Sequence, residues 1–447
     1  MTAPRTVKCV VWDLDRTLVD GVWLERDRDG VLAADPQLLA AAVELATRGV
    51  LNAVASRNPP QVWDQVRDLL APVTFVAVEL GWDRKSQSLE RIAERLGFGV
   101  EALAFVDDDP YERAEVAFAL PQVLVLSPAE LVDALSWPEL TPPVVTAEAT
   151  RRSDLYRAAQ HRQHGQQAAR EAGRPIEQFL AEIGTRIRIR PATDADLPRL
   201  HELSVRTHRF NSTGEVLDPA HLQALAGNSR YRLPVVELSD RFGDDGLVGA
   251  LVLDTAPGGW TVDLLMMSCR AIGRGVIERL LDWLVVQAAA GGAGPIRVAC
   301  RPTDRNVPLR LALTAAGFRP DGDAGDGRSL TTFSRAVQPQ PVEPPVEPPV
   351  EPQGEVAQPE PTGLPEVAEV AEVAELLADI LGRPDLVGLA AGAELFGGEV
   401  GLDSLRGTLL LARIRQRYRV DVAELDLNLD SLASLGALAH LIHQHRP

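Results

Sequence analysis

The stretch KCVVWDLDRTL, residues 8–18, decides the fold of the first part of the chain. The apolar residues 7–12 predict a buried strand, and this strand ends in two carboxylates, Asp13 and Asp15, two positions apart. In open α/β sheets, ligands bind outside the carboxyl ends of the strands. The two carboxylates therefore indicate a site at the edge of such a sheet.

Strand-like and helix-like segments alternate through the rest of residues 1–145. The patterns predict further strands at 49–55, 75–78 and 103–106, and helices at 36–48, 60–70 and 86–96. This alternation is typical of βαβ units around a parallel sheet. Residues 1–145 are therefore predicted to form a Rossmann-like α/β domain.

The later strands of this region end in groups suited to phosphate chemistry. A hydroxyl and an amide (Ser56, Asn58) follow the second strand, Lys85 follows the third, and Asp107 and Asp108 follow the fourth. A lysine can neutralise charge on a transferring phosphoryl group, and carboxylates are hard ligands that suit Mg²⁺. A single acidic strand end is usually a solvated turn, but four polar strand ends in succession indicate a phosphoryl-transfer site.

The DxDxT motif at 13–17, with these strand ends, resembles the haloacid dehalogenase superfamily. The resemblance implies that Asp13 is the nucleophile and Asp15 the acid/base, with Lys85 as a further catalytic group. It also implies a phosphate site at Thr17, Ser56, Asn58 and Lys85, and Mg²⁺ at Asp13, Asp15, Asp107 and Asp108. The gaps 16–55 and 86–106 each hold about one helix, so the domain is expected to be capless and its site open.

Five motifs narrow the resemblance: residues 8–18, FVDDDPYERAEV at 105–116, THRFN at 207–211, SDRFGDDGLVG at 239–249 and SCRAIGRGV at 268–276. Together they resemble the FkbH-like proteins of polyketide assembly lines, over about 8–319. That resemblance implies removal of phosphate from 1,3-bisphosphoglycerate and delivery of a glyceryl group to a carrier-protein thiol. The chain departs from the family at Arg16, where Asn is common, and at Ala55, where Cys is common.

Residues 146–336 are predicted to form an α+β domain. After a polar helical stretch at 146–184, strands are expected at 186–190, 233–238, 248–253, 262–267 and 296–300. Between a predicted strand and helix 276–287, residues 270–275 fit [RQ]xxGx[GA] and resemble the GNAT acyltransferase motif, which implies cofactor binding at Arg270, Gly273 and Gly275. A helix start and its glycines favour a pyrophosphate. Leu313 stands where such enzymes often carry a tyrosine acid, which favours holding a phosphopantetheine arm over amine acetylation.

Three cysteines offer thiols, and Cys269 is the one placed for chemistry. It precedes Arg270 and is a candidate catalytic nucleophile that relays the acyl group; the alternative is a small buried strand residue. Cys300 is a second candidate, whereas Cys9 lies in the apolar first strand and is predicted to be core. His208, which stands where the family usually has Asn, is interpreted as structural or solvent-facing, and the acidic run 240–246 as a turn.

The C-terminal quarter divides into a linker and a small helical domain. Residues 337–363 are rich in Pro, Val and Glu and predict an extended polyproline II linker. Residues 364–447, with GLDSL at 401–405, resemble an all-α, four-helix acyl carrier protein, which implies 4′-phosphopantetheine on Ser404. Ser431 lies in a second Asp-Ser-Leu that lacks the preceding Gly-Leu, and it is interpreted as part of an ordinary helix cap.

Composition excludes several classes of protein. The 447 residues are enough for about three domains, and 45% hydrophobic residues are too many for a disordered chain. A net charge of −18 argues against nucleic-acid or anionic-membrane partners, and no stretch is apolar enough to span a bilayer. Three cysteines favour a reducing cytoplasm over a disulfide scaffold.

The sequence therefore predicts a multidomain, cytoplasmic enzyme that loads its own carrier. Asp13 is expected to take phosphate from an acyl phosphate such as 1,3-bisphosphoglycerate, and the acyl group to pass, through Cys269, to the thiol on Ser404. The expected partners are downstream polyketide synthase or tailoring enzymes. Two alternatives stay open: a carrier and docking scaffold with degenerate domains, and a GNAT-type acetyltransferase with a phosphatase-like domain.

Overall fold

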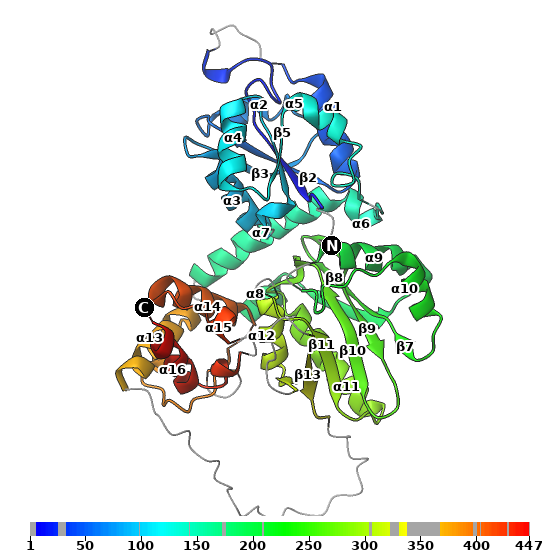
Figure 1. Cartoon of the computed structure of the whole chain (residues 1–447), viewed down its shortest axis with the longest axis vertical. Helices are drawn as coiled ribbons and strands as arrows, with labels where there is room; N and C mark the ends of the chain where they lie inside the picture. Colours follow the sequence, from blue (N-terminus) through cyan, green and yellow to red (C-terminus); the bar gives the residue numbers. More distant parts are fainter. Residues whose placement is uncertain are drawn as a thin grey trace, which may run out of the picture. The chain divides into compact units, whose positions relative to one another are not determined.

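The computed structural model describes residues 6–25, 33–97, 99–142, 144–171, 176–207, 210–303, 306–321, 330–337, 367–396, 400–402, 404–426 and 429–446 (Figure 1). The chain divides into two compact units. The first comprises Met1–Arg186 with Leu238–Gly246, and the second comprises Ile187–Glu237 with Leu247–Pro447.

The first unit is built on a five-stranded parallel sheet with the order β3-β2-β1-β4-β5. Its strands are β1 (Cys9–Trp12), β2 (Leu51–Ser56), β3 (Phe75–Leu80), β4 (Leu103–Val106) and β5 (Leu124–Leu126). The four predicted strands and their parallel pairing are confirmed. β5 escaped prediction because three residues at a half-exposed sheet edge carry almost no periodic signal.

Both faces of this sheet are buried, which explains why its strands are almost continuously apolar. Val10 and Trp12 pack into one core cluster with Val54. The alternate residues Cys9 and Val11 pack into a second cluster on the opposite face.

Helices connect these strands and surround the sheet (Figure 1): α1 (Pro36–Thr47), α2 (Val62–Val66), α3 (Lys85–Leu96), α4 (Pro110–Ala119) and α5 (Pro128–Ala134). Short 3₁₀ turns form at η1 (Trp23–Glu25) and η2 (Val100–Ala102). The helix predicted at 60–70 is shorter than expected, because the regular part of that stretch ends at Val66.

The polar helical stretch after residue 145 belongs to the first unit. It contains α6 (Ala147–Thr150), α7 (Arg152–Glu171) and α8 (Ile176–Glu182). Arg152 Nη1 donates to the carbonyl of Gly49 over 2.7 Å. Arg162 of α7 is buried and pairs with Asp240 at 2.6 Å and with Asp245 at 3.0 Å.

The second sheet has eight strands in the order β12-β13-β11-β10-β9-β8-β6, with β7 paired to β9. Its strands are β6 (Arg186–Pro191), β7 (Tyr231–Arg232), β8 (Pro234–Asp240), β9 (Gly243–Asp254), β10 (Trp260–Met267), β11 (Ile296–Cys300), β12 (Arg319–Pro320) and β13 (Thr331–Arg335). The accompanying helices are α9 (Leu197–Arg206), α10 (Pro219–Ala226), α11 (Val276–Ala290) and α12 (Val307–Ala315), with turns η3 (Asp194–Asp196) and η4 (Cys269–Ala271). All five predicted strands of this region are present.

The turn predicted at 240–246 is wrong for most of its length. Only Arg241 and Phe242 separate β8 from β9, and the acidic residues that follow are already in β9. Asp245 is completely buried and is paired with Arg162. Because its charge is neutralised by a residue 83 positions away, the local composition could not indicate a strand.

The C-terminal region of the second unit is helical, and its core cluster also includes Val307 and Leu311 of α12. It contains α13 (Val367–Leu381), η5 (Pro384–Leu386), α14 (Ser404–Tyr418), α15 (Val422–Leu425), η6 (Asp430–Ala433) and α16 (Leu435–His445). Leu377, Leu410, Ile414 and Leu438 meet in its centre. The predicted linker at 337–363 lies outside the described residues except for Val337. None of the helices in the described ranges is both long and apolar enough to cross a membrane.

Candidate functional site

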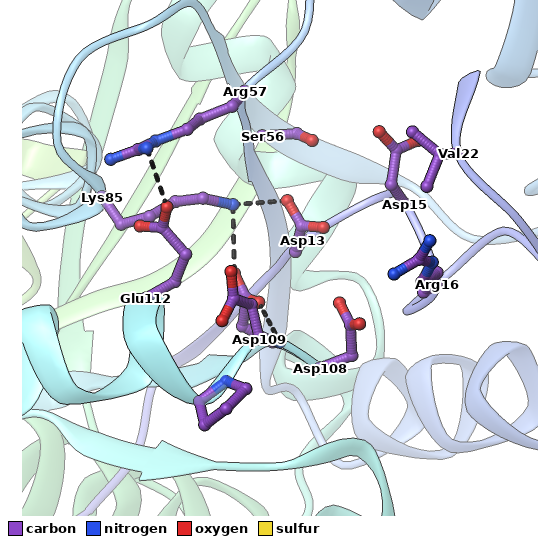
Figure 2. Close-up of a pocket in the computed structure, with 12 residues that line it drawn as sticks. Asp13, Asp15, Arg16, Val22, Ser56, Arg57, Lys85, Asp108, Asp109 and Glu112 are labelled. Atoms are coloured by element: carbon purple, nitrogen blue, oxygen red, sulfur yellow. Dashed lines mark hydrogen bonds and ion pairs between the residues drawn. The ribbon is translucent and has the colours of Figure 1, made fainter. Parts of the chain in front are cut away.

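Asp13 lies directly after β1 at the carboxyl edge of the parallel sheet. Its backbone N–H donates to the carbonyl of Val106 on β4 over 2.9 Å, which fixes the residue between two strands. The residue is 7% exposed, and its carboxylate accepts a hydrogen bond from Lys85 Nζ, as Figure 2 shows. The predicted nucleophile is therefore held by Lys85 and lines the cavity described below.

Lys85, the first residue of α3, ties three strand ends together. Its Nζ donates to Asp13 and to the carbonyl of Ala55 at 2.7 Å, and lies 3.1 Å from Asp107 Oδ2. Burial acts to lower the pKa of Lys85, but Asp13 and Asp107 outweigh it and the net pKa is raised. Lys85 therefore stays charged in a buried site.

Three carboxylates gather beside this lysine. Asp13, Asp107 and Asp108 each offer an oxygen, and these oxygens lie within 4.8 Å of one another. Burial raises the pKa of Asp107 to about 7, a rise that Lys85 opposes and Asp13 adds to. Burial and the charge of Asp13 also raise the pKa of Asp108. A set of hard oxygens whose charges destabilise one another fits Mg²⁺, which would relieve the repulsion.

Asp15, the fourth predicted metal ligand, is not in this group. One of its carboxylate oxygens accepts from the backbone N–H of Trp23 at 3.0 Å, and the other accepts from Asn58 Nδ2 at 3.0 Å. Asp15 still lines the same cavity. This fixed position suits the predicted acid/base role better than metal binding through the side chain.

The predicted phosphate-binding residues divide into two pairs. Ser56 and Lys85 line the cavity. Asn58 is fully buried and donates to Asp15 and, over 3.2 Å, to Ser56 Oγ. The Thr17 hydroxyl accepts from the backbone N–H of Asp108 over 3.2 Å. The side chains of Thr17 and Asn58 thus position neighbours and do not line the cavity.

The cavity itself measures about 420 Å³ and includes residues that the sequence did not single out. Arg57 Nη1 lies 3.0 Å from Glu112, whose side chain is buried. Arg113 Nη1 donates to the carbonyls of Asp107 and Asp108, both at 2.7 Å, and so shapes the loop that carries them. Glu112 and Arg113 are in the first turn of α4, which directly follows the acidic residues 107–109. This closeness in sequence to the predicted metal ligands is the feature that could have identified both residues.

In the second unit, the predicted cofactor motif forms the turn before α11. Gly273 and Gly275 have φ of 71° and 69°, left-handed values that favour glycine. Cys269 and Arg270 lie in η4 and are partly exposed. Cys9 and Cys300 are buried, and burial raises the pKa of both thiols, that of Cys300 to about 12.

A short segment of the chain fills the space where β10 and β11 separate. The parallel pairing of these strands is recorded from Trp260↔Ile296 to Val262↔Val298. Beyond it, Ser212 donates its N–H to the carbonyl of Leu265 at 2.9 Å and accepts, through its own carbonyl, from Arg301 N–H at 2.7 Å. The Ser212 hydroxyl also accepts from Leu265 N–H at 3.0 Å. The backbone groups of Leu265 and Arg301 that could bind the amides of an extended ligand are therefore hydrogen-bonded to Ser212 instead.

A second cavity, of about 550 Å³, lies against the sheet of this unit. Glu215, His221, Tyr231, Asp263 and Arg301 supply its polar lining, and Arg270, Gly273 and Gly275 are not part of its wall. Burial raises the pKa of Asp263. Leu313 is fully buried, and His208 lies outside the described residues.

In the C-terminal region, Ser404 is the first residue of α14. The interpretation of Ser431 as part of a helix cap is wrong, because Ser434 is the residue that caps α16. Ser431 lies inside η6, where its N–H donates to Asp426 at 2.6 Å and its hydroxyl oxygen is buried. The structure therefore separates the two Asp-Ser-Leu sites by their element: one at the start of a fifteen-residue helix, the other in a packed 3₁₀ turn.

Comparison with known proteins bears most directly on this C-terminal region. Residues 371–442 match the family model for the phosphopantetheine attachment site. The chain therefore has a C-terminal phosphopantetheine-binding carrier domain, and its setting is phosphopantetheine-based biosynthesis. No curated protein matches the chain.

Solved structures resemble the two larger regions. The phosphatase-containing N-terminal part of BF1531 from Bacteroides fragilis, complexed with Mg, is 23% identical with a TM-score of 0.27, over 30% of this chain and 40% of that structure. The ribosomal-protein-S18-alanine N-acetyltransferase of Escherichia coli is 14% identical with a TM-score of 0.27, over 34% of this chain and 94% of that one. An N-acetyltransferase from Staphylococcus aureus Mu50 is 14% identical with a TM-score of 0.27, over 34% and 99%.

Proposed function

We propose that the chain is an enzyme that loads a glyceryl or similar small hydroxyacyl group from 1,3-bisphosphoglycerate onto the phosphopantetheine thiol of its own carrier domain, with loss of phosphate. The observation that carries this proposal is the position of Asp13, which is held by Lys85 beside Asp107 and Asp108. A carboxylate fixed in this way suits attack on phosphorus. The carrier domain supplies an acceptor of matching chemistry.

The atoms of the reaction decide which group attacks which centre. If Asp13 attacked the phosphorus of the acyl phosphate, the P–O bond would break and an unactivated carboxylate would leave, which cannot become a thioester. The expectation that Asp13 acts on the acyl phosphate is therefore revised. A thiolate attacks the carbonyl carbon instead, the C–O bond breaks, and inorganic phosphate leaves with the electron pair.

Asp13 is then assigned to the phosphate ester at the other end of the substrate. Its carboxylate attacks phosphorus and forms an aspartyl phosphate, and the departing alkoxide takes its proton from Asp15. Water then hydrolyses the aspartyl phosphate. Lys85 keeps Asp13 oriented and places positive charge beside the transferring group. Mg²⁺, held by Asp13, Asp107 and Asp108, would supply further neutralisation of the phosphoryl oxygens.

The route of the acyl group has two versions, which differ in one residue. In the relay version the Cys269 thiolate receives the acyl group first and passes it to the arm on Ser404. In the direct version the arm attacks the acyl phosphate itself. Ala55, where the family commonly has a thiol, offers only its carbonyl, which binds Lys85. If the Cys269→Ala variant loads its carrier domain at the normal rate, the relay version is wrong.

Intact-protein mass spectrometry tests the proposal. The holo chain, incubated with 1,3-bisphosphoglycerate and Mg²⁺, should gain the mass of one glyceryl group. Ser404→Ala should gain nothing in the direct version, and in the relay version any adduct it gains should disappear when Cys269→Ala is added. Asp13→Asn should show either no adduct or one heavier by a phosphate, never the glyceryl adduct. If the wild-type chain gains no mass from glyceryl, lactyl or acetyl donors, the proposed function is wrong.

A further inference from the structure

Arg16 has a backbone conformation that its residue type does not favour. Its φ is +53°, in the left-handed region that side-chain-bearing residues other than Asn and Asp rarely adopt. The neighbouring hydrogen bond from Arg16 N–H to the carbonyl of Gly21, at 3.0 Å, closes this turn. The turn would accept Asn or Gly with less strain, so the arginine side chain itself needs an explanation.

The side chain of Arg16 contributes to the wall of the cavity that holds Asp13 (Figure 2). It is 61% exposed, and its Nη2 lies 3.7 Å from Glu25, too far for a hydrogen bond. Its charge nevertheless reaches into the site, because Arg16 acts to lower the pKa of Asp108 against the larger effect of burial. The guanidinium is therefore near the metal-binding carboxylates but presented to solvent.

The other two cations of the cavity have close partners within it. Lys85 is held by Asp13 and Asp107, and Arg57 is held by Glu112 at 3.0 Å. Arg16 thus differs from both by its exposure and its long pairing distance. A planar guanidinium in this state is suited to a two-oxygen anion that arrives with a ligand.

We propose that Arg16 is a specificity-determining residue, which binds a second anionic group of a small substrate while the phosphoryl group of that substrate lies at Asp13. This inference rests on the proposed function and deepens it: Arg16 selects, among phosphate esters, those that also carry a carboxylate or a second phosphate. A mere counter-charge for the acidic cluster would strengthen the binding of every phosphate ester equally. A specificity residue changes the ratio between ligands with and without the second anion.

Binding of two matched probes separates these roles. Phosphoglycolate and ethyl phosphate have similar shapes, and only the first carries a carboxylate beside its phosphate ester. Calorimetric titration of the full chain with Mg²⁺ should give a Kd for phosphoglycolate about tenfold below that for ethyl phosphate. In Arg16→Asn, which suits the left-handed turn and should fold normally, this ratio should fall below about twofold. Arg16→Lys keeps the positive charge but loses the paired N–H donors of the guanidinium, so it should keep only part of the difference between the two Kd values.

An unchanged ratio in Arg16→Asn, or equal binding of both probes by the wild-type chain, would overturn the role of Arg16. The intact-mass loading assay with 1,3-bisphosphoglycerate is run in parallel. If no glyceryl group is loaded while the Arg16-dependent ratio persists, the proposed reaction fails and the anion site stands. If glyceryl is loaded and the ratio does not depend on Arg16, the reaction stands and the anion site fails.

Discussion

Asp107 is the residue whose ionisation the site changes most clearly. Burial raises its pKa to about 7, from a usual value near 3.9 for aspartate. Between about pH 4 and 7 the folded protein therefore holds this proton more tightly than the unfolded chain does. In the absence of divalent cations, the contribution of Asp107 to stability is complete below pH 4 and is lost as the pH rises through 7.

We therefore expect the free energy of unfolding in EDTA to fall between pH 5 and 7, with Asp107 contributing at most about 1.4 kcal/mol per pH unit. Asp107→Asn should remove that contribution, whereas Asp133→Asn, at an exposed position in the same unit, should leave it. Urea unfolding at pH 5, 6, 7 and 8 measures the slopes. The expectation fails if the Asp107→Asn slope equals that of the wild type.

The three thiols differ in accessibility, and this difference can be measured. Cys9 and Cys300 are buried with raised pKa values, so little thiolate forms at pH 8, while Cys269 is partly exposed. Iodoacetamide should therefore modify the native chain once and the urea-unfolded chain three times, as read by intact mass. Cys269→Ser should abolish the native modification. Modification of the native Cys269→Ser chain would show that a buried thiol is reachable.

The left-handed backbone at Arg16 predicts that glycine at this position gives a more stable protein than alanine does. Glycine adopts a φ of +53° freely, whereas alanine is penalised there by about 1 kcal/mol. Arg16→Gly should therefore unfold a few degrees above Arg16→Ala in a thermal scan, although both remove the same charge. The usual order, with alanine the more stable, would contradict a left-handed residue 16.

At the scale of elements, the segment at residues 210–212 substitutes for strand pairing. Ser212 is fully buried, and its hydroxyl accepts the N–H of Leu265 on β10. Ser212→Ala would leave this N–H without the hydroxyl, which costs about 1–3 kcal/mol. Thr213→Ala, at a partly exposed neighbour, should change stability by less than about 0.5 kcal/mol. Chemical denaturation of both variants checks this, and equal effects would mean that the hydroxyl bond contributes nothing.

Elements were predictable where their pattern is local. β1, β2 and β4 are short apolar runs buried on both faces, so composition alone predicts them. The prediction for β9 began too late, at residue 248 instead of Gly243, because Asp245 is neutralised by Arg162, which lies on another element. The partnership of Arg57 with Glu112 is likewise hidden, since 55 positions separate two residues that only the folded sheet edge brings together. Local sequence therefore predicts the reactive groups better than it predicts what surrounds them.

At the scale of the whole molecule, charge is concentrated toward the C-terminal end. Residues 337–447 hold eighteen acidic side chains against seven arginines, a net charge of −11 out of −18 for the chain. The cavity of the first unit is acidic as well, because its three cations, Lys85, Arg57 and Arg16, face six carboxylates. Like net charge on acceptor and cavity opposes their approach at low ionic strength, and added salt screens that repulsion.

The carrier domain makes a prediction about where that acceptor group is attached. Ser404 begins α14, whereas the Ser431 hydroxyl is buried in η6. A phosphopantetheinyl transferase with coenzyme A should therefore add one phosphopantetheine group to the wild-type chain. Ser404→Ala should take up none, and Ser431→Ala, the matched control in the second Asp-Ser-Leu, should be modified like the wild type. Intact mass measures the addition. If the Ser404→Ala chain is still modified, the phosphopantetheine group is attached at another residue, and Ser404 does not carry the acceptor of the proposed reaction.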